Sequence, residues 1–210
     1  MIERKHAEYA RELRQEGDLS LAGEHYTSSA YGYLMRFRKV DRNEPEALAP
    51  PMFGKFATNL FLGALCHRIA GDLERSNNQC KVAIFLIKDI RDHVPRFSGR
   101  SGIPMGLCHE LIGDFRLLGG FDSHDIPYQE AKQVYSRTDN DRQWSAEPEF
   151  EIQMMLFIDL AESVGFDFSE EEKEEIQYLS LEKRIQYKRN NFSLIIDQVI
   201  EAGNWKSDRF

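Results

Sequence analysis

The 210-residue sequence has only three cysteines, only seven prolines and no long hydrophobic run. The cysteines are odd in number and lie in expected helices, which argues against an extracellular disulfide framework and fits a reducing compartment. No stretch approaches the roughly 20 apolar residues that a membrane-spanning helix needs. Residues 1–6 lead into a charged helix and not into an apolar signal region. We therefore expect a cytoplasmic protein without a membrane partner.

Positive charge is also in short supply, because 27 Lys and Arg stand against 35 Asp and Glu, which gives a formal net charge of −8. An acidic chain repels phosphate backbones, so nucleic acid is not the expected partner. The sequence is 41% hydrophobic and 30% charged, which is typical of a folded soluble protein and too apolar for disorder. At this length we expect a single all-helical domain over residues 1–210.

Apolar residues recur at three- and four-residue steps, and no alternating strand pattern interrupts them. The sequence therefore predicts an all-α protein of about eight or nine helices. The expected helices cover residues 2–16, 19–38, 52–70, 73–92, 104–118, a segment from Ser123 or Asp125, 147–164, a segment from Ser169, and a last helix after Asn190-Asn191. A short helical turn is expected at 43–46, and loops at 94–104 and 136–144.

One motif recurs along the chain. Leu65-Cys66-His67, three residues and then Gly71-Asp72 return as Leu107-Cys108-His109, three residues and Gly113-Asp114, with a fainter copy at 13–19. Each copy is an apolar helical run with Gly-Asp near its end, and glycine is common just past a helix C-terminus. In the last copy the apolar helix continues to Leu118, so we place its turn at Gly119. Such motifs indicate stacked helix-turn-helix units.

Three helix pairs share small and apolar positions at matching places. The matching residues are His6, Tyr9, Ala10, Leu13, Ala22 and Tyr26 in the first pair, Leu60, Gly63, Ala64, His67, Ser76 and Cys80 in the second, and Cys108, Leu111, Ile112, Phe115, His124 and Tyr128 in the third. The pairs resemble tetratricopeptide repeats, whose pattern runs W-x₂-L-G-x₂-Y and then A-x₃-F. The resemblance covers residues 2–138 and leaves 147–202 as C-terminal helices.

The resemblance implies an irregular α-solenoid, because the pairs are spaced more widely than the 34 residues of a regular array. It further implies a scaffold for protein–protein interaction, a non-catalytic adaptor or regulator. In such repeats the first helices line the concave face. Arg14, Arg68 and Arg116 each stand three residues before an expected turn glycine, and Arg11 lies one turn before Arg14. This basic stripe predicts an acidic peptide or a C-terminal carboxylate of a partner protein as the ligand. The alternative is a set of ordinary solvent-facing arginines.

Chemical motifs are scarce: the sequence has no G-x-S-x-G, no Walker loop and no H-E-x-x-H. Cys66, His67, Cys108 and His109 offer zinc-type ligands, but adjacent helical residues point about 100° apart, so we expect them to pack in the core. We therefore expect no catalytic residue, no metal and no cofactor. A helical enzyme, or a small-ligand or metal sensor with a site between the helix layers, stays the alternative.

The last third of the chain is rich in ordered charges. Ser169-Glu170-Glu171-Glu172 is a capping-box pattern that predicts a helix start. The basic run from Lys183 to Arg189 follows acidic residues, and we expect it to be a solvated helix face and not a nucleic-acid contact. Whether these helices form a homodimer is left open by the sequence.

Overall fold

The structure is a computed structural model that describes residues 2–43, 52–93, 102–137, 148–176, 180–205, 207 and 209–210. The described residues form nine α-helices and no strand, so the all-α prediction is confirmed for them. The helices are α1 (Ile2–Glu16), α2 (Leu19–Asn43), α3 (Met52–Ile69), α4 (Leu73–His93), α6 (Ile103–Leu118), α7 (Asp125–Tyr135), α9 (Pro148–Ser163), α10 (Glu170–Glu174) and α11 (Leu181–Ala202). None of these helices is long and apolar enough to cross a membrane.

Most helices begin and end near the predicted residues, with one clear extension. The second helix, α2, continues to Asn43, beyond the predicted end at residue 38. The expected turn at 43–46 and most of the expected loops at 94–104 and 136–144, with Arg96 and Arg100, lie outside the described residues.

The first two helix pairs turn in the same way. Gly17 and Gly71 adopt positive φ angles of 89° and 84°, and the N–H of each donates to the carbonyl three residues earlier at 3.1 Å. The side chains of Asp18 and Asp72 then accept from backbone N–H groups three residues later, at 3.2 and 3.0 Å. Each Gly-Asp therefore ends one helix and caps the next, as the motif predicts.

The third turn lies one residue later than predicted. Gly113 lies in the middle of α6, and the helix ends at Leu118. Gly120, with φ 63°, adopts the left-handed conformation that we expected at Gly119. Gly119 instead leaves room for the ring of Phe121, because a Cβ at position 119 would lie 2.5 Å from that ring.

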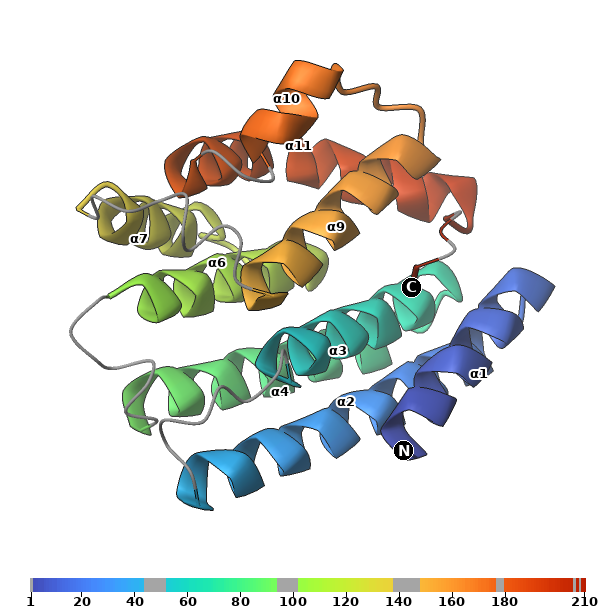
Figure 1. Ribbon diagram of the computed structural model, residues 1–210. Coiled ribbons are helices and arrows are strands. Elements are labelled where there is room, and N and C mark those ends of the chain that lie inside the picture. The colour runs from blue at the N-terminus through green and yellow to red at the C-terminus, as the bar shows by residue number, and fades with distance from the viewer. Residues whose placement is uncertain are drawn as a thin grey trace.

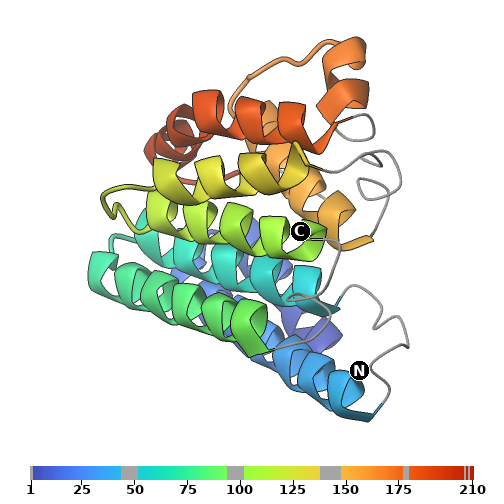
Figure 2. The same ribbon diagram turned by 90° about the vertical axis from the view of Figure 1, so that its left-hand side faces the viewer.

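The helices follow their chain order in space from α1 to α7, and each packs against its sequence neighbour (Figures 1 and 2). The later helices depart from this order. The helix α9 crosses α3, while α11 packs against α7 and α9. The third helix, α3, therefore lies inside the molecule and is buried almost all round, as its uniformly apolar sequence predicts.

Four phenylalanines join the early and late helices into one core. The ring of Phe61 on α3 lies 5.7 Å from that of Phe115 on α6 and 5.8 Å from that of Phe192 on α11. Phe192 also contacts Phe157 of α9 at 5.4 Å. Aromatic pairs at these separations add roughly 0.5–1.5 kcal/mol each beyond their buried area.

Two glycines of α3 allow its neighbours to approach closely. A Cβ on Gly63 would lie 2.7 Å from the Thr27 hydroxyl oxygen of α2, and a Cβ on Gly54 would lie 3.1 Å from the Glu149 Cα of α9. The backbones of α3 and α2 therefore approach closely at Gly63. These contacts fix α3 between α2 and α9.

The last helices divide at a different place from the one predicted. The Ser169 capping box is confirmed, since its hydroxyl accepts from the Glu172 N–H and the Glu172 carboxylate accepts from the Ser169 N–H. The predicted break at Asn190-Asn191 is wrong, because α11 runs through both residues. Asn costs a helix only a fraction of a kcal/mol, and the buried face of α11 continues past it to Phe192.

Candidate functional site

A cavity of about 480 Å³, called the cleft below, opens between α1, α2, α3 and α9. The size falls within the roughly 300–1,000 Å³ that is typical of small-ligand sites. The residues that line it are Arg4, Ala7, Glu8, Arg11, Tyr26, Tyr33, Arg36, Met52, Lys55, Thr58, Asn59, Leu62, Ile152, Arg209 and Phe210. The helix α3 contributes five of these residues, and its position is fixed by the contacts of Gly63 with α2 and of Gly54 with α9.

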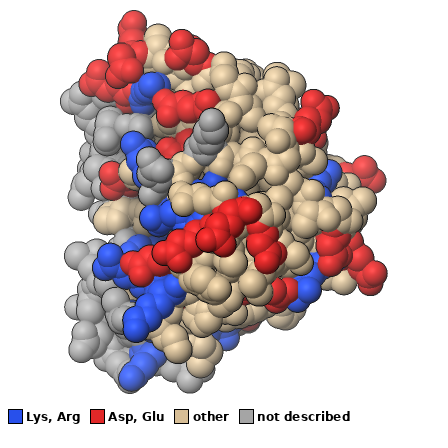
Figure 3. Space-filling model, turned by 90° about the vertical axis from the view of Figure 1, so that its right-hand side faces the viewer, with Lys and Arg blue, Asp and Glu red and all other residues tan. Residues whose placement is uncertain are grey.

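Cationic side chains dominate this lining. The helices α1, α2 and α3 and the residues after α11 contribute five of them: Arg4, Arg11, Arg36, Lys55 and Arg209. Among the lining residues, Glu8 contributes the one acidic side chain. Figure 3 shows the side of the molecule that carries α1, where blue side chains gather at the lower left with red ones between them. In a chain of net charge −8, such a concentration of positive charge favours anionic ligands.

Three of the cleft arginines, Arg4, Arg36 and Arg209, already contact carboxylates, and Arg209 Nη1 lies 3.2 Å from Asp159 Oδ1. Arg4 Nε lies 2.9 Å from Glu8 Oε1, one helical turn away. Arg36 Nη1 donates to Glu3 Oε1 at 2.5 Å, and this hydrogen bond lowers the pKa of Glu3. The exposed Arg4–Glu8 pair contributes only about 0–1 kcal/mol, so a carboxylate of a ligand can compete for Arg4. Glu3 and Asp159 are buried, at 5% and 8% exposed, so their pairs with Arg36 and Arg209 belong to the protein's own packing.

Lys55, like Arg11, makes no ion pair with a carboxylate in the described part of the chain. Its ammonium lies 5.6 Å from the centre of the Tyr33 ring. Thr58 and Asn59, one turn further along α3, bring a hydroxyl and an amide to the same cleft. The Thr58 hydroxyl accepts from the Gln153 amide at 2.8 Å. The Lys55 ammonium, which has unused hydrogen-bond donors, therefore lies near the Thr58 hydroxyl and the Asn59 amide.

Two further polar atoms of cleft residues are buried without a well-formed hydrogen bond, the Tyr26 hydroxyl and Arg11 Nε. Burial raises the pKa of Tyr26 to about 12, against the opposing effect of the Arg14 charge. The hydroxyl is therefore protonated at neutral pH and can donate. A buried polar group without a partner costs about 1–3 kcal/mol, which a bound acceptor would recover.

The described residues after Gly203 close one side of the cleft. They pack on Arg14, which is 1% exposed. Its guanidinium donates to main-chain oxygens of Trp205, Ser207 and Phe210, and lies 4.5 Å from the centre of the Trp205 ring. An arginine of α1 therefore already binds the main chain of a peptide segment here.

The four arginines of the predicted stripe lie in different environments. Arg11 lines the cleft, and its Nη2 donates to the Arg209 carbonyl at 2.9 Å. Arg14 is buried beside it, as described above. Arg68 donates to the Leu118 carbonyl and Arg116 to the Ser123 carbonyl, and neither lines the cleft. The structure thus places Arg11 in the cleft lining and Arg14 behind it, buried against the residues after Gly203, and it places the other two at helix ends.

The prediction that Arg14, Arg68 and Arg116 occupy equivalent positions is wrong by one residue in the third helix pair. Gly120 donates its N–H to the carbonyl of Leu117, just as the earlier turn glycines donate to Arg14 and Arg68. Leu117, and not Arg116, therefore occupies the equivalent position. The sequence does not show which of the adjacent Gly119 and Gly120 forms the turn, so the one-residue difference was missed. Partner binding by the arginines stays a prediction.

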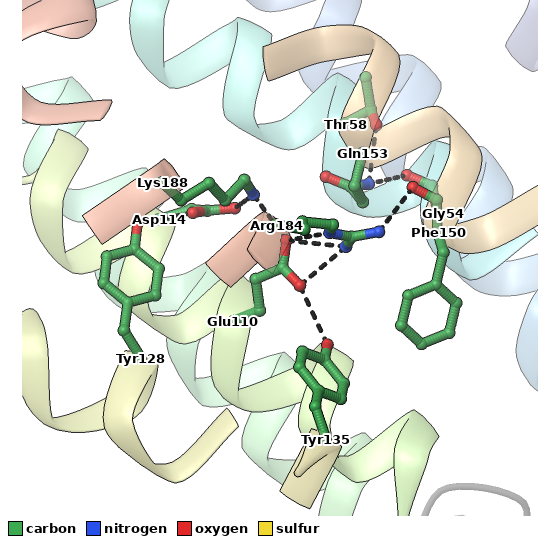
Figure 4. Close-up of polar contacts among 10 residues, drawn as sticks. All are labelled: Gly54, Thr58, Glu110, Asp114, Tyr128, Tyr135, Phe150, Gln153, Arg184 and Lys188. Carbon is green, nitrogen blue, oxygen red and sulfur yellow. Dashed lines mark hydrogen bonds and ion pairs between the residues drawn. The ribbon is translucent and has the colours of Figure 1, made fainter. Parts of the chain in front are cut away.

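A second charged cluster, called the buried network below, lies inside the molecule (Figure 4). The Glu110 carboxylate accepts from Arg184 Nη2 at 2.7 Å with both oxygens, and the Lys188 ammonium lies 2.8 Å from Glu110 Oε1. The same ammonium donates to Asp114 Oδ2 at 2.6 Å. All four side chains are at most 3% exposed. Two acids of α6 thus face two bases of α11.

Two tyrosines of α7 complete the buried network. Tyr128 donates to Asp114 Oδ1 at 2.7 Å and Tyr135 to Glu110 Oε2 at 3.0 Å. Burial opposes ionisation of Glu110, but the charges of Arg184 and Lys188 prevail and hold its pKa at about 2. Because the groups satisfy one another and are shielded from water, this cluster is suited to holding three helices together.

Sequence analysis did not find the buried network. The prediction that the run from Lys183 to Arg189 is a solvated face is wrong for Arg184 and Lys188, which point into the core. A signal was present: Glu110 and Asp114 stand four residues apart on an apolar helix, with the same spacing as the two bases. That matching period places each pair on one helix face.

The cysteines pack in the core as predicted. Cys66, Cys80 and Cys108 are free and fully buried. Burial raises the pKa of Cys66 and of Cys80 to about 12, so their thiolates are not available at neutral pH. Within the described ranges, no group of three or more His, Cys, Asp or Glu side chains is arranged to hold a metal ion.

Comparison of the chain with protein families, with curated proteins and with solved structures finds no match. Interpretation of the cleft therefore rests on its geometry and charge.

Proposed function

We propose that the protein is a non-catalytic adaptor or regulator that binds an acidic peptide segment of a partner protein in the cleft. The observation that carries this proposal is the convergence of five cationic side chains, Lys55 among them without a carboxylate partner in the described part of the chain. Carboxylates of Asp and Glu are the protein groups that pair with such cations.

The contacts between two arginines of α1 and the residues after Gly203 support a peptide as the ligand. Arg11 and Arg14 donate to main-chain oxygens of Trp205, Ser207, Arg209 and Phe210, so the chemistry of peptide capture is present on α1. An extended ligand would present carbonyls to arginines and acidic side chains to Lys55 and Arg4. This arrangement combines main-chain affinity with charge selectivity.

The finer fold interpretation belongs to the same proposal. We propose that α1–α2 and α3–α4 are tetratricopeptide-like pairs, on the support of their matching Gly-Asp turns. Such pairs commonly present their first helices to a ligand, and here α1 and α3 supply most of the cleft lining.

The test is fluorescence anisotropy with a labelled Glu-rich peptide. We expect saturable binding that weakens as salt rises to about 0.15 M and beyond, because exposed charges are screened. Lys55→Glu should weaken binding about tenfold or more, since one charge-assisted contact becomes repulsive. Arg137→Glu is the matched control: it makes the same change in net charge at an exposed site outside the cleft. Equal affinities for the two variants would refute the proposal.

A second candidate is a sensor for a small anionic molecule, which the cavity volume favours. Titration with small di- and tricarboxylates in the same assay separates the two. If a small anion binds more tightly than the peptide and displaces it, the cleft is a small-ligand site.

A further inference from the structure

Four large apolar side chains lie exposed on the face that α2 and α4 share, called the α2–α4 strip below. Tyr31 and Met35 of α2 are 42% and 69% exposed, and Val82 and Phe85 of α4 are 41% and 70% exposed. Scattered apolar residues are common on protein surfaces, but contiguous ones mark interaction sites.

The contacts between α2 and α4 show that these residues form one strip. Glu24 pairs with Arg75 at the N-terminal ends of the helices, and Arg38 Nη2 contacts Asp89 Oδ2 at 2.7 Å near the C-terminal ends. The two helices therefore run parallel and side by side, with α4 on the outside of the molecule in Figure 2. The four apolar residues lie between the two ion pairs, which gives an apolar centre with polar ends.

The strip also contains a groove and a projecting side chain. A groove of about 360 Å³ is lined by Tyr31, Asn78 and Val82, together with polar residues near the start of α4. Phe85 lies one turn beyond the groove and projects into solvent. Position 78 and position 85 are placed symmetrically about residues 81 and 82 of α4.

Two charged residues of α4 follow the same symmetry, while the ammonium of Lys81, at its centre, lies 5.9 Å from the centre of the Phe121 ring. Glu74 is exposed near the N-terminal end of α4 and Lys88 near its C-terminal end, and neither has an ion-pair partner among the described residues. At 1.5 Å per residue they lie about 21 Å apart, and the midpoint falls at residue 81. Under a two-fold axis at that midpoint, each carboxylate meets an ammonium.

We propose that the α2–α4 strip is the interface of a two-fold symmetric homodimer. Two copies pair with their α4 helices antiparallel, and Phe85 of each copy enters the groove at Asn78 and Val82 of the other. Glu74 of each copy faces Lys88 of its partner. A second copy fits because groove and side chain, and acid and base, exchange places under one two-fold rotation, as an isologous interface requires.

The first test is the mass in solution, measured by light scattering and sedimentation equilibrium. The wild-type chain should form a dimer, and Phe85→Lys should be monomeric at the same concentration with unchanged helix content by circular dichroism. Leu194→Lys is the matched control, since Leu194 is 51% exposed on α11 and should leave the dimer intact. A wild-type chain that stays monomeric up to roughly millimolar concentration would overturn the proposal.

A charge exchange makes the test specific to this pairing. Glu74→Lys and Lys88→Glu each place like charges opposite one another in a homodimer, so each variant alone should dimerise more weakly. An equimolar mixture should restore the wild-type dimer, because both contacts again join opposite charges. The double variant should dimerise by itself. If the mixture dimerises no better than either variant, the antiparallel pairing is wrong, even if the chain forms a dimer.

Discussion

The cleft and the buried network use the same kinds of side chain for opposite purposes. In the network, two acids, two bases and two tyrosines satisfy one another away from water. In the cleft, five cationic side chains line one cavity, and Lys55 among them has no carboxylate partner in the described part of the chain. The polar groups of the buried network have no free hydrogen-bonding capacity for a ligand, whereas the cleft still has unused hydrogen-bond donors.

This difference shows that the pairing of charges, and not their number, separates a structural cluster from a binding site. Lys188 and Lys55 are both lysines on helices that pack against the core. Lys188 has two carboxylates within 2.8 Å, whereas Lys55 lies against a tyrosine ring. Substitutions in the two regions should therefore separate stability from binding.

The largest expected effect is on the buried network. Glu110→Gln should lower the free energy of unfolding by about 3–5 kcal/mol, because Arg184 and Lys188 would keep their buried charges with one carboxylate fewer. Chemical denaturation measures the change. Glu174→Gln, on the exposed face of α10, is the control and should change stability by less than about 0.5 kcal/mol. A loss below about 1 kcal/mol for Glu110→Gln would show that the network is not a structural element.

Acid should weaken the same region. The folded pKa of Glu110, about 2, lies below its ordinary value of 4.5. The stability that Glu110 contributes is therefore fully present above pH 4.5 and is lost as the pH falls toward 2. Burial raises the pKa of Asp114, which acts in the opposite direction and cannot produce this loss. Urea denaturation between pH 5 and 2 should show a steep decline for the wild type and a flatter one for Glu110→Gln.

Between the two regions lies α3, and its packing should tolerate little added volume. Ala64 is fully buried, so Ala64→Leu should overpack the contact and cost about 1–3 kcal/mol. Ala64→Ser, which adds little volume, separates overpacking from simple loss of alanine. An unchanged melting temperature for Ala64→Leu would show that Ala64 is not at a helix contact.

The smallest change in stability is expected in the cleft. Lys55→Met keeps the length of the side chain and removes its charge, and it should change the free energy of unfolding by less than about 0.5 kcal/mol. The same variant should bind the Glu-rich peptide more weakly. A large loss of stability would mean that Lys55 belongs to a structural cluster, and the contrast between the regions would fail.

Helix periodicity made much of the fold predictable from the sequence. The Gly-Asp turns at Gly17 and Gly71 were found because glycine and aspartate each have a distinct role at helix ends. Gly119 and Gly120 could not be told apart, since composition does not reveal which of two adjacent glycines takes positive φ. The end of α10 at Glu174 was missed because the sequence has no glycine or proline between it and Ser180, which caps α11.

The site was harder to predict than the fold. Arg11 and Arg14 were identified as candidates; Arg11 lines the cleft, whereas Arg14 is buried beside it. Lys55 and Arg36 were missed, because they reach the cleft from different helices and no local pattern connects them. Arg184 and Lys188 were misread as solvated, since their partners lie 74 residues earlier in the chain.

Hydrogen–deuterium exchange with and without a saturating Glu-rich peptide tests the central contrast most directly. The peptide should slow exchange in α1 and the first half of α3, where the cleft residues lie, and should leave α7 and the first half of α11 unchanged. Protection centred on α6, α7 and α11 with none at α1 and α3, or no protection anywhere, would contradict the assignment of binding to the cleft.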